Sequence, residues 1–239
     1  MKFIYIATKD LKIFFKDIQA LAMLIIAPIM MILIMGAAFP GEEGVSYAIP
    51  GMSIMFLLFA CVMQGSMSIL DERESGTLRR LMIAPVTRSS IIAGKVLAYY
   101  VLGLTQISVL MVLSHLVCGM NFGNISALIT LVLATTAAAS GLGMLVAVFS
   151  KTKPQGHTLS LVAIMFMSAL GGSWWSVSMY PPLMEKIAYI TTINAWAIEG
   201  LQNVMFHGYG LTEVAVDVCA LLVFALAFFA VAVKSFRFE

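Results

Sequence analysis

The sequence predicts an all-α integral membrane protein with six transmembrane helices, an amino-terminal amphipathic interfacial helix, a short cytoplasmic helix between spans 2 and 3, and a re-entrant helical pair before span 6. The first observation behind this prediction is composition. The 239 residues are 61% hydrophobic and only 11% charged, whereas soluble domains carry about 25% charged residues. A soluble core of this size could not bury so much apolar surface. The second observation is a series of long apolar blocks, and the third is the confinement of charge to the segments between them.

Six apolar blocks are long enough to cross a bilayer, which requires about 20 residues. They cover residues 20–39, 49–70, 96–118, 125–149, 157–176 and 213–233. Within the fourth block, the pairs Ala137/Gly141 and Ala139/Gly143 give the small-xxx-small spacing that lets another helix approach closely.

The distribution of Lys and Arg predicts the orientation of these spans. Thirteen of the 14 basic residues fall before span 1, between spans 2 and 3, between spans 4 and 5, or after span 6, and only Lys186 falls on the other side. The positive-inside rule therefore places both termini and the 71–95 segment in the cytoplasm of a multi-pass protein of the cell membrane.

Residues 1–17 predict an amphipathic helix in the cytoplasmic interface. Its apolar face carries Phe3, Ala7, Leu11 and Phe14, and lysines occupy the opposite face. A lipid anchor and a packing role against other helices fit this pattern equally well.

Residues 177–212 form a long segment that is too polar for an easy lipid-facing span. The apolar stretch 187–206 includes Asn194, Glu199 and two further amides. Polar backbone at membrane depth is tolerated only against protein or water. We expect a pair of short helices that enter from the extracellular side and return. A seventh full span is the competing interpretation, and it would move the basic carboxyl terminus outside.

The segment 71–95 concentrates eight of the 26 charged residues between two spans. Gly76 should interrupt the helix that leaves span 2, and Pro85 should end the short helix that follows. Leu78, Leu81 and Met82 share one face of that helix. We expect Glu72 and Glu74 to pair with nearby arginines in the same segment.

The sequence around this short helix resembles the signature of ABC-2 type permeases, the membrane subunits of a large group of ATP-binding-cassette exporters. The resemblance rests first on Glu72-Arg73-Glu74-x-Gly76-Thr77-Leu78-x-x-Leu81-x-x-x-Pro85, followed by Gly94-Lys95. It rests also on Pro182–Ala188 and Trp196–Leu201 before the last span. Together with the span pattern it covers about residues 1–235, so that residues 1–239 read as a single transmembrane domain. The family often has a proline where this chain has Thr191-Thr192-Ile193-Asn194.

The resemblance implies a role for each segment. Residues 1–17 would be the connecting helix, residues 77–84 the coupling helix seated on an ATPase subunit, and residues 177–212 the extracellular re-entrant helices. The residues implied in ATPase coupling are Glu72, Arg73, Glu74, Gly76, Thr77, Leu78, Arg80, Leu81 and Pro85. The candidates for the re-entrant turn or the pathway are Asn194, Trp196 and Glu199.

The sequence lacks a phosphate-binding G-x-x-x-x-G-K-[ST] loop, because Ser89 stands where Gly94-Lys95 would require a glycine. ATP and Mg are therefore expected on a partner ATPase rather than on this chain, which we do not expect to be an enzyme. No metal-binding or catalytic motif is present in the sequence, and the basic residues do not gather on a soluble face as nucleic-acid binding requires.

These observations predict the permease subunit of an ABC exporter that moves an amphiphilic or hydrophobic substrate, such as a drug, an antibiotic, a lipid or a glycan. Two ATPase copies and a second permease copy, identical or not, would complete the complex in the bilayer. The alternative is a stand-alone ion-coupled secondary transporter, for which internal repeats and several buried ionisable groups would be expected. A membrane-embedded enzyme would instead need a cluster of His, Asp or Glu within one leaflet.

Overall fold

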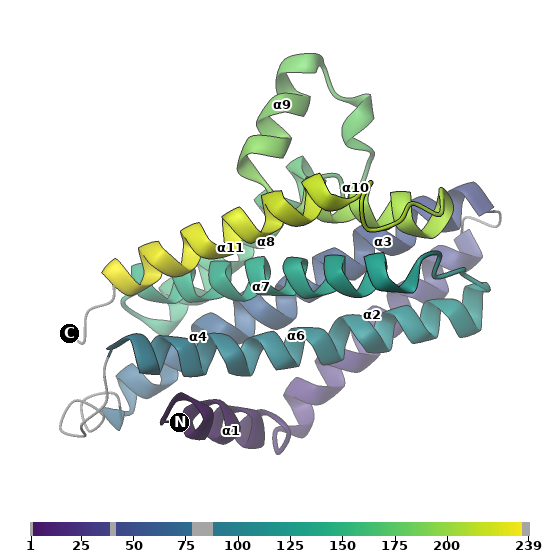
Figure 1. Ribbon diagram of the computed structural model, residues 1–239. Coiled ribbons are helices and arrows are strands. Elements are labelled where there is room, and N and C mark those ends of the chain that lie inside the picture. The colour runs from purple at the N-terminus through teal and green to yellow at the C-terminus, as the bar shows by residue number, and fades with distance from the viewer. Residues whose placement is uncertain (1, 39–41, 78–87, 236–239) are drawn as a thin grey trace.

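The computed structural model describes residues 2–38, 42–77 and 88–235, and within these ranges it contains helices and turns but no strand. The long helices run side by side as one bundle (Figure 1). The helices are α1 Lys2–Phe14, α2 Ile18–Ala38, α3 Glu42–Leu58, the π-helix η1 Phe59–Met63, α4 Gln64–Glu74, α6 Arg88–Cys118, α7 Ile125–Phe149, α8 Lys153–Leu170, the 3-10 turn η2 Val177–Met179, α9 Pro182–Thr191, α10 Ile193–Phe206 and α11 Ala215–Ser235.

Four helical stretches within the described residues are long and apolar enough to cross a membrane. They are Ala48–Glu74, Ser89–Cys118, Ile125–Phe149 and Ala215–Ser235. They coincide with the predicted second, third, fourth and sixth spans. The chain is therefore an all-α membrane protein that crosses the bilayer more than once.

The other two predicted spans correspond to α2 and α8. Helix α2 has 21 residues, and its described residues include the apolar stretch Leu24–Ile34. The fifth predicted span extends to residue 176, but its helix α8 ends at Leu170, because Gly171 and Gly172 begin a turn in which Gly172 has φ +89°. The count of six spans stays a prediction.

Helix α7 lies at the centre of the bundle, between α11 on one side and α4, α6 and η1 on the other. Asn124 begins the helix, because its side chain accepts hydrogen bonds from the backbone N–H groups of Ser126 and Ala127. The small residues of α7 face two neighbours. A Cβ on Gly143 would lie 2.4 Å from the Cys61 carbonyl oxygen, and one on Gly141 would meet Phe228 of α11. The close helix approach predicted from the glycine spacing is confirmed.

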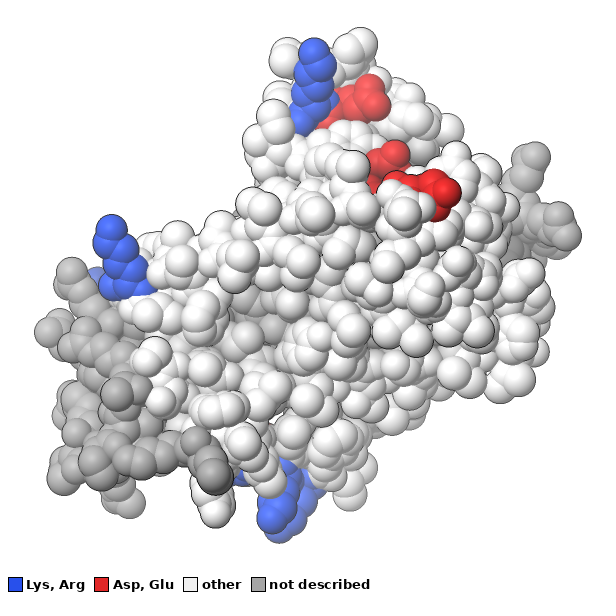
Figure 2. Space-filling view, in the orientation of Figure 1, with Lys and Arg blue, Asp and Glu red and all other residues white. Residues whose placement is uncertain are grey.

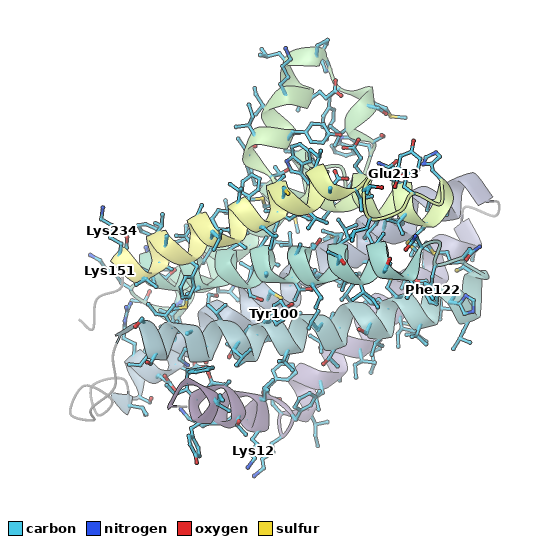
Figure 3. The ribbon with its side chains drawn as sticks, in the orientation of Figure 1. Lys12, Tyr100, Phe122, Lys151, Glu213 and Lys234 are labelled. Carbon is cyan, nitrogen blue, oxygen red and sulfur yellow. The ribbon has the colours of Figure 1, made fainter. Side chains whose placement is uncertain are left out.

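The two ends of the bundle differ in charge. Helix α1 and the carboxyl end of α11 lie at one end, and α9 projects away from the bundle above α8 and α10 (Figure 1). On the face shown in Figure 2, acidic side chains appear only near α9 and α10. Lys12, Lys151 and Lys234 lie at the α1 end, whereas Glu213 lies at the opposite end (Figure 3).

Candidate functional site

The predicted coupling segment begins as an extension of helix rather than as a loop. Helix α4 continues through Asp71 to Glu74, and α6 begins at Arg88, so that Lys95 lies inside a helix. Gly76 follows the end of α4 with φ +69° and open space around its Cβ position. This is the left-handed conformation that glycine adopts without strain. The expected break at Gly76 is confirmed.

The rest of the predicted coupling helix lies outside the described residues. Thr77 is helical and is the last described residue before residue 88. Leu78, Arg80, Leu81 and Pro85 fall between them, so that the coupling helix and its apolar ridge stay a prediction.

The end of α4 is anchored to three other parts of the bundle. Glu72 extends toward α1 and α6, where its carboxylate forms ion pairs with Lys9 and with Lys95, the latter at 3.1 Å. The Nζ atom of Lys95 also lies 3.0 Å from Asp10 Oδ2 and donates a hydrogen bond to Ser68 at 2.8 Å. Among the described residues Glu72 is held by lysines from two other helices and not by Arg73, whereas the predicted arginine partners Arg79 and Arg80 lie outside the described residues.

The other charged residues of this turn of helix contact the α7–α8 connection. Arg73 donates a hydrogen bond to the backbone carbonyl of Ser150. Lys153 bridges Asp71 at 2.7 Å and Glu74 at 3.3 Å, where the sequence had predicted an arginine partner for Glu74. Hydrogen bonding to Asp71, and then to Glu74, raises the pKa of Lys153. Every charged residue from 71 to 74 thus contacts an element distant in sequence.

Asp10, Lys9 and Lys153 are the members of this cluster that sequence analysis did not select. Asp10 has 5% of its surface exposed, although it belongs to a helix otherwise rich in exposed charge. A carboxylate among the lysines of an amphipathic helix was the available signal, but its buried partner is 85 residues away in the chain. Only the folded bundle brings the two together.

The three pathway candidates all lie on α10, but they have different surroundings. Asn194 is fully buried and donates a hydrogen bond to Ser173 Oγ at 3.0 Å. Trp196 donates from Nε1 to the Tyr189 carbonyl at 2.7 Å, and the two rings stack edge to face at 5.0 Å. Both residues fasten segments together. Glu199 alone lines a cavity, a polar one of about 230 Å³.

The connection between α9 and α10 is made by Thr192, at the point where the family often has a proline. Its backbone is extended, with ψ 138°. Its hydroxyl donates to the Ala188 carbonyl at 2.8 Å and accepts from the Ala195 N–H at 3.4 Å. One side chain thereby ends α9 and begins α10.

A second cavity, of about 360 Å³, lies where η1 interrupts the second span. Its polar lining consists of Gln64, Gln106 and His157, and Phe56, Phe59 and Met63 are among its apolar residues. Gln106 is buried within the span Ser89–Cys118. Single π-helical turns occur often at functional sites. The sequence did not predict this cavity, although glutamines within apolar blocks were a visible signal.

Within residues 2–38, 42–77 and 88–235, no group of three or more His, Cys, Asp or Glu side chains lies close enough together to hold a metal ion. The charged groups at the end of α4 are instead arranged as alternating acids and bases. Such an arrangement connects helices through paired charges.

Comparison with known proteins identifies related sequences. A profile of the family described as ABC-2 family transporter protein matches residues 39–234. The linearmycin resistance permease protein LnrN of Bacillus subtilis is 31% identical over 188 residues, which are 78% of this chain and 48% of the relative.

Two more distant bacterial relatives have similar descriptions. The probable multidrug ABC transporter permease YbhS of Escherichia coli is 22% identical over 79% of this chain and 50% of its own length. The inner membrane transport permease YhhJ of Escherichia coli is 22% identical over 75% of this chain and 48% of its own length. The chain spans about half the length of these curated relatives.

Proposed function

Because the chain belongs to the ABC-2 family of transporter proteins, we propose that it is the permease subunit of an ABC exporter in the cytoplasmic membrane. ATP bound with Mg to a separate ATPase subunit drives the movement of an amphiphilic or hydrophobic substrate. In this proposal two ATPase copies and a second permease copy form the complete transporter. Each permease contributes six spans, with both termini in the cytoplasm.

The observation that carries this proposal is the anchoring of the end of α4. Its four charged residues contact α1, α6 and the α7–α8 connection. A partner that pushes on the adjoining segment 75–87 therefore acts on several helices at once. In this proposal Glu72, Arg73 and Glu74 transmit the force, and Leu78 and Leu81 dock on the ATPase.

The polarity of charge along the bundle supports the proposed orientation. The anchored end of α4 lies beside Lys9, Lys95 and Lys153. Basic residues concentrate on the cytoplasmic side of membrane proteins. A cytoplasmic ATPase would meet the protein at this end, and the α9–α10 pair would lie at the extracellular end.

The cavity at η1 supports an amphiphilic substrate. Its aromatic and methionine side chains would bury an apolar body, and Gln64, Gln106 and His157 offer hydrogen bonds to polar groups. The names of the relatives, which refer to linearmycin resistance and to multidrug transport, support a drug or antibiotic substrate for this chain also.

The test reconstitutes the full chain with the ABC-type ATPase that co-purifies with it and measures uptake of a fluorescent amphiphilic dye into inside-out vesicles. We expect uptake that requires ATP and an intact phosphate-binding lysine in the ATPase. The double variant Glu74→Lys, Leu81→Asp should abolish uptake, and Lys12→Gln, at an exposed residue of α1, should leave it unchanged.

Two results would contradict the proposal. Normal ATP-driven uptake by the double variant would show that Glu74 and Leu81 do not couple the permease to the ATPase. Uptake that follows an imposed ion gradient without any ATPase would identify a secondary transporter instead.

A further inference from the structure

The Gly94-Lys95 pair has a structural role at the place where α1 crosses α6. A Cβ on Gly94 would lie 2.7 Å from the Phe3 carbonyl oxygen and 2.8 Å from Ile6 Cβ. Both contacts are shorter than packed atoms tolerate, and one involves backbone. Only glycine at this position lets α1 approach α6 so closely. Ile6, which interrupts the polar face of α1, packs against this glycine.

Lys95 follows this crossing and is 1% exposed. Its Nζ atom has oxygen partners from two helices: Asp10 at 3.0 Å on α1, and Glu72 at 3.1 Å and Ser68 at 2.8 Å on α4. An ammonium group removed from water must keep such partners, because separating them leaves an uncompensated buried charge. The three helices are therefore held at one point.

Apolar contacts extend the same interface along α1. Ala7 and Phe14 are buried in a cluster with Ala98, Tyr99 and Leu102 of α6. The alternative of a helix that only rests in lipid is thereby excluded for this face of α1. Helix α1 packs against α6, and the buried Lys95 belongs to this contact.

Helix α1 leads directly into α2, which begins at Ile18. Leu24 and Ala27 of α2 line the 360 Å³ cavity, together with Phe59 and Met63 of η1. A displacement of α1 would therefore reach one wall of this cavity through α2, while the continuous helix from α4 through η1 reaches another wall.

We propose that Gly94, Lys95 and Asp10 form a fixed joint between α1 and the helices that flank the coupling segment. Through this joint α1 moves with the ends of α4 and α6 as one unit and carries the motion to α2. Lys95 and Asp10 are positioning residues in this scheme. The role in transport rests on the proposed function, whereas the joint itself does not.

The first experiment tests the joint in the full chain alone, in lipid nanodiscs. Spin labels are placed at Lys12→Cys on α1 and Lys151→Cys, both exposed positions, in a background with Cys118→Ser and Cys219→Ser. Asp10→Asn should broaden the distance distribution by about twofold, because one partner of the buried lysine loses its charge. Gly94→Val should shift its mean. Asp10→Glu, which keeps a carboxylate opposite Lys95, should keep the narrow distribution, and Lys16→Gln is the exposed control.

The second experiment measures dye molecules exported per ATP hydrolysed, in the complex with the same co-purifying ATPase. Asp10→Asn should lower this ratio by about tenfold with basal ATP hydrolysis unchanged, since the loss is one of coupling between sites. Asp10→Glu should keep the wild-type ratio. A role confined to folding would lower both activities together.

Three outcomes would overturn the joint. They are an unchanged distance distribution in both Asp10→Asn and Gly94→Val, equal loss of hydrolysis and export in Asp10→Asn, and the same broadening in Asp10→Glu as in Asp10→Asn while Asp10→Glu keeps the wild-type thermal midpoint. If the wild-type complex shows no ATP-driven export while the first experiment succeeds, the proposed function fails and the joint stands.

Discussion

Two lysines at the same end of the bundle each bridge two carboxylates, but in different surroundings. Lys95 bridges Asp10 and Glu72 with 1% of its side chain exposed, whereas Lys153 bridges Asp71 and Glu74 with 42% exposed. Exposed ion pairs contribute little because water screens them. Buried pairs matter mainly through the cost of breaking them.

The matched substitutions Lys95→Met and Lys153→Met should therefore differ strongly. We expect Lys95→Met to destabilise the protein by about 3–5 kcal/mol, since two buried carboxylates lose their buried counter-charge and keep only the partly exposed Lys9 beside them. Lys153→Met should shift the thermal midpoint only slightly. Thermal unfolding of both variants in the same detergent measures the difference, and equal shifts would show that burial does not distinguish the two sites.

The pH dependence of the Lys153 bridge has a defined sign. Hydrogen bonding to Asp71 and Glu74 raises the pKa of Lys153 above its ordinary 10.5. A raised pKa means that the contribution to stability is complete below the ordinary value and is lost as pH rises through the raised one. Lys153→Met should therefore be slightly less stable than wild type at neutral pH, and the difference in stability should disappear in strongly alkaline solution, where Lys153 itself loses its charge.

At the scale of helices, the contact between α7 and the π-helix η1 depends on one glycine. The Cβ of an alanine at position 143 would lie 2.4 Å from the Cys61 carbonyl oxygen and 3.0 Å from Val62 Cα. The same atom at Gly65 in α4 would meet only ordinary contacts, at 3.5 Å and beyond. Both positions are helical, so that intrinsic propensity favours alanine at each.

We expect Gly143→Ala to lower the free energy of unfolding by about 1–3 kcal/mol, because backbone must shift to admit the methyl group. Gly65→Ala should be neutral or slightly stabilising. Denaturant unfolding of the two variants decides the point. Equal stability would mean that α7 and η1 move apart without cost.

Thr192 fixes the turn between α9 and α10 through the hydrogen bonds of its hydroxyl, whereas a proline would fix the turn through its ring. Thr192→Val keeps the shape of the side chain and removes both of its hydrogen bonds, including the helix cap. We expect the free energy of unfolding to fall by about 0.5–2 kcal/mol. Thr191→Val is the matched control, since the Thr191 hydroxyl makes only a bond to the Ile187 carbonyl, at 2.7 Å on an exposed surface. Limited proteolysis measures this loss of stability. We expect faster cleavage at the turn in Thr192→Val and unchanged cleavage in Thr191→Val.

At the scale of the molecule, the predicted orientation determines which positions an extracellular reagent can label. In intact cells, a membrane-impermeant thiol reagent should modify Lys186→Cys on α9 and spare Lys12→Cys, Lys151→Cys and Lys234→Cys. Each variant is made with Cys118→Ser and Cys219→Ser. Permeabilised cells should label all four. The six-span arrangement places one crossing between positions 151 and 186. Labelling of Lys151→Cys and Lys186→Cys from the same side would therefore reject it.

The sequence alone determined the membrane character of the chain, four of its spans, the break at Gly76 and the family. Each depends on composition or on short-range pattern, which local physics fixes. The tertiary structure decided which charges meet. Nothing local marks Asp10 as the partner of Lys95, or Lys153 as the partner of Glu74, because those pairs join helices distant in the chain. A charged side chain that is buried away from water needs a partner of opposite charge, and the packing of the helices decides which partner is within reach.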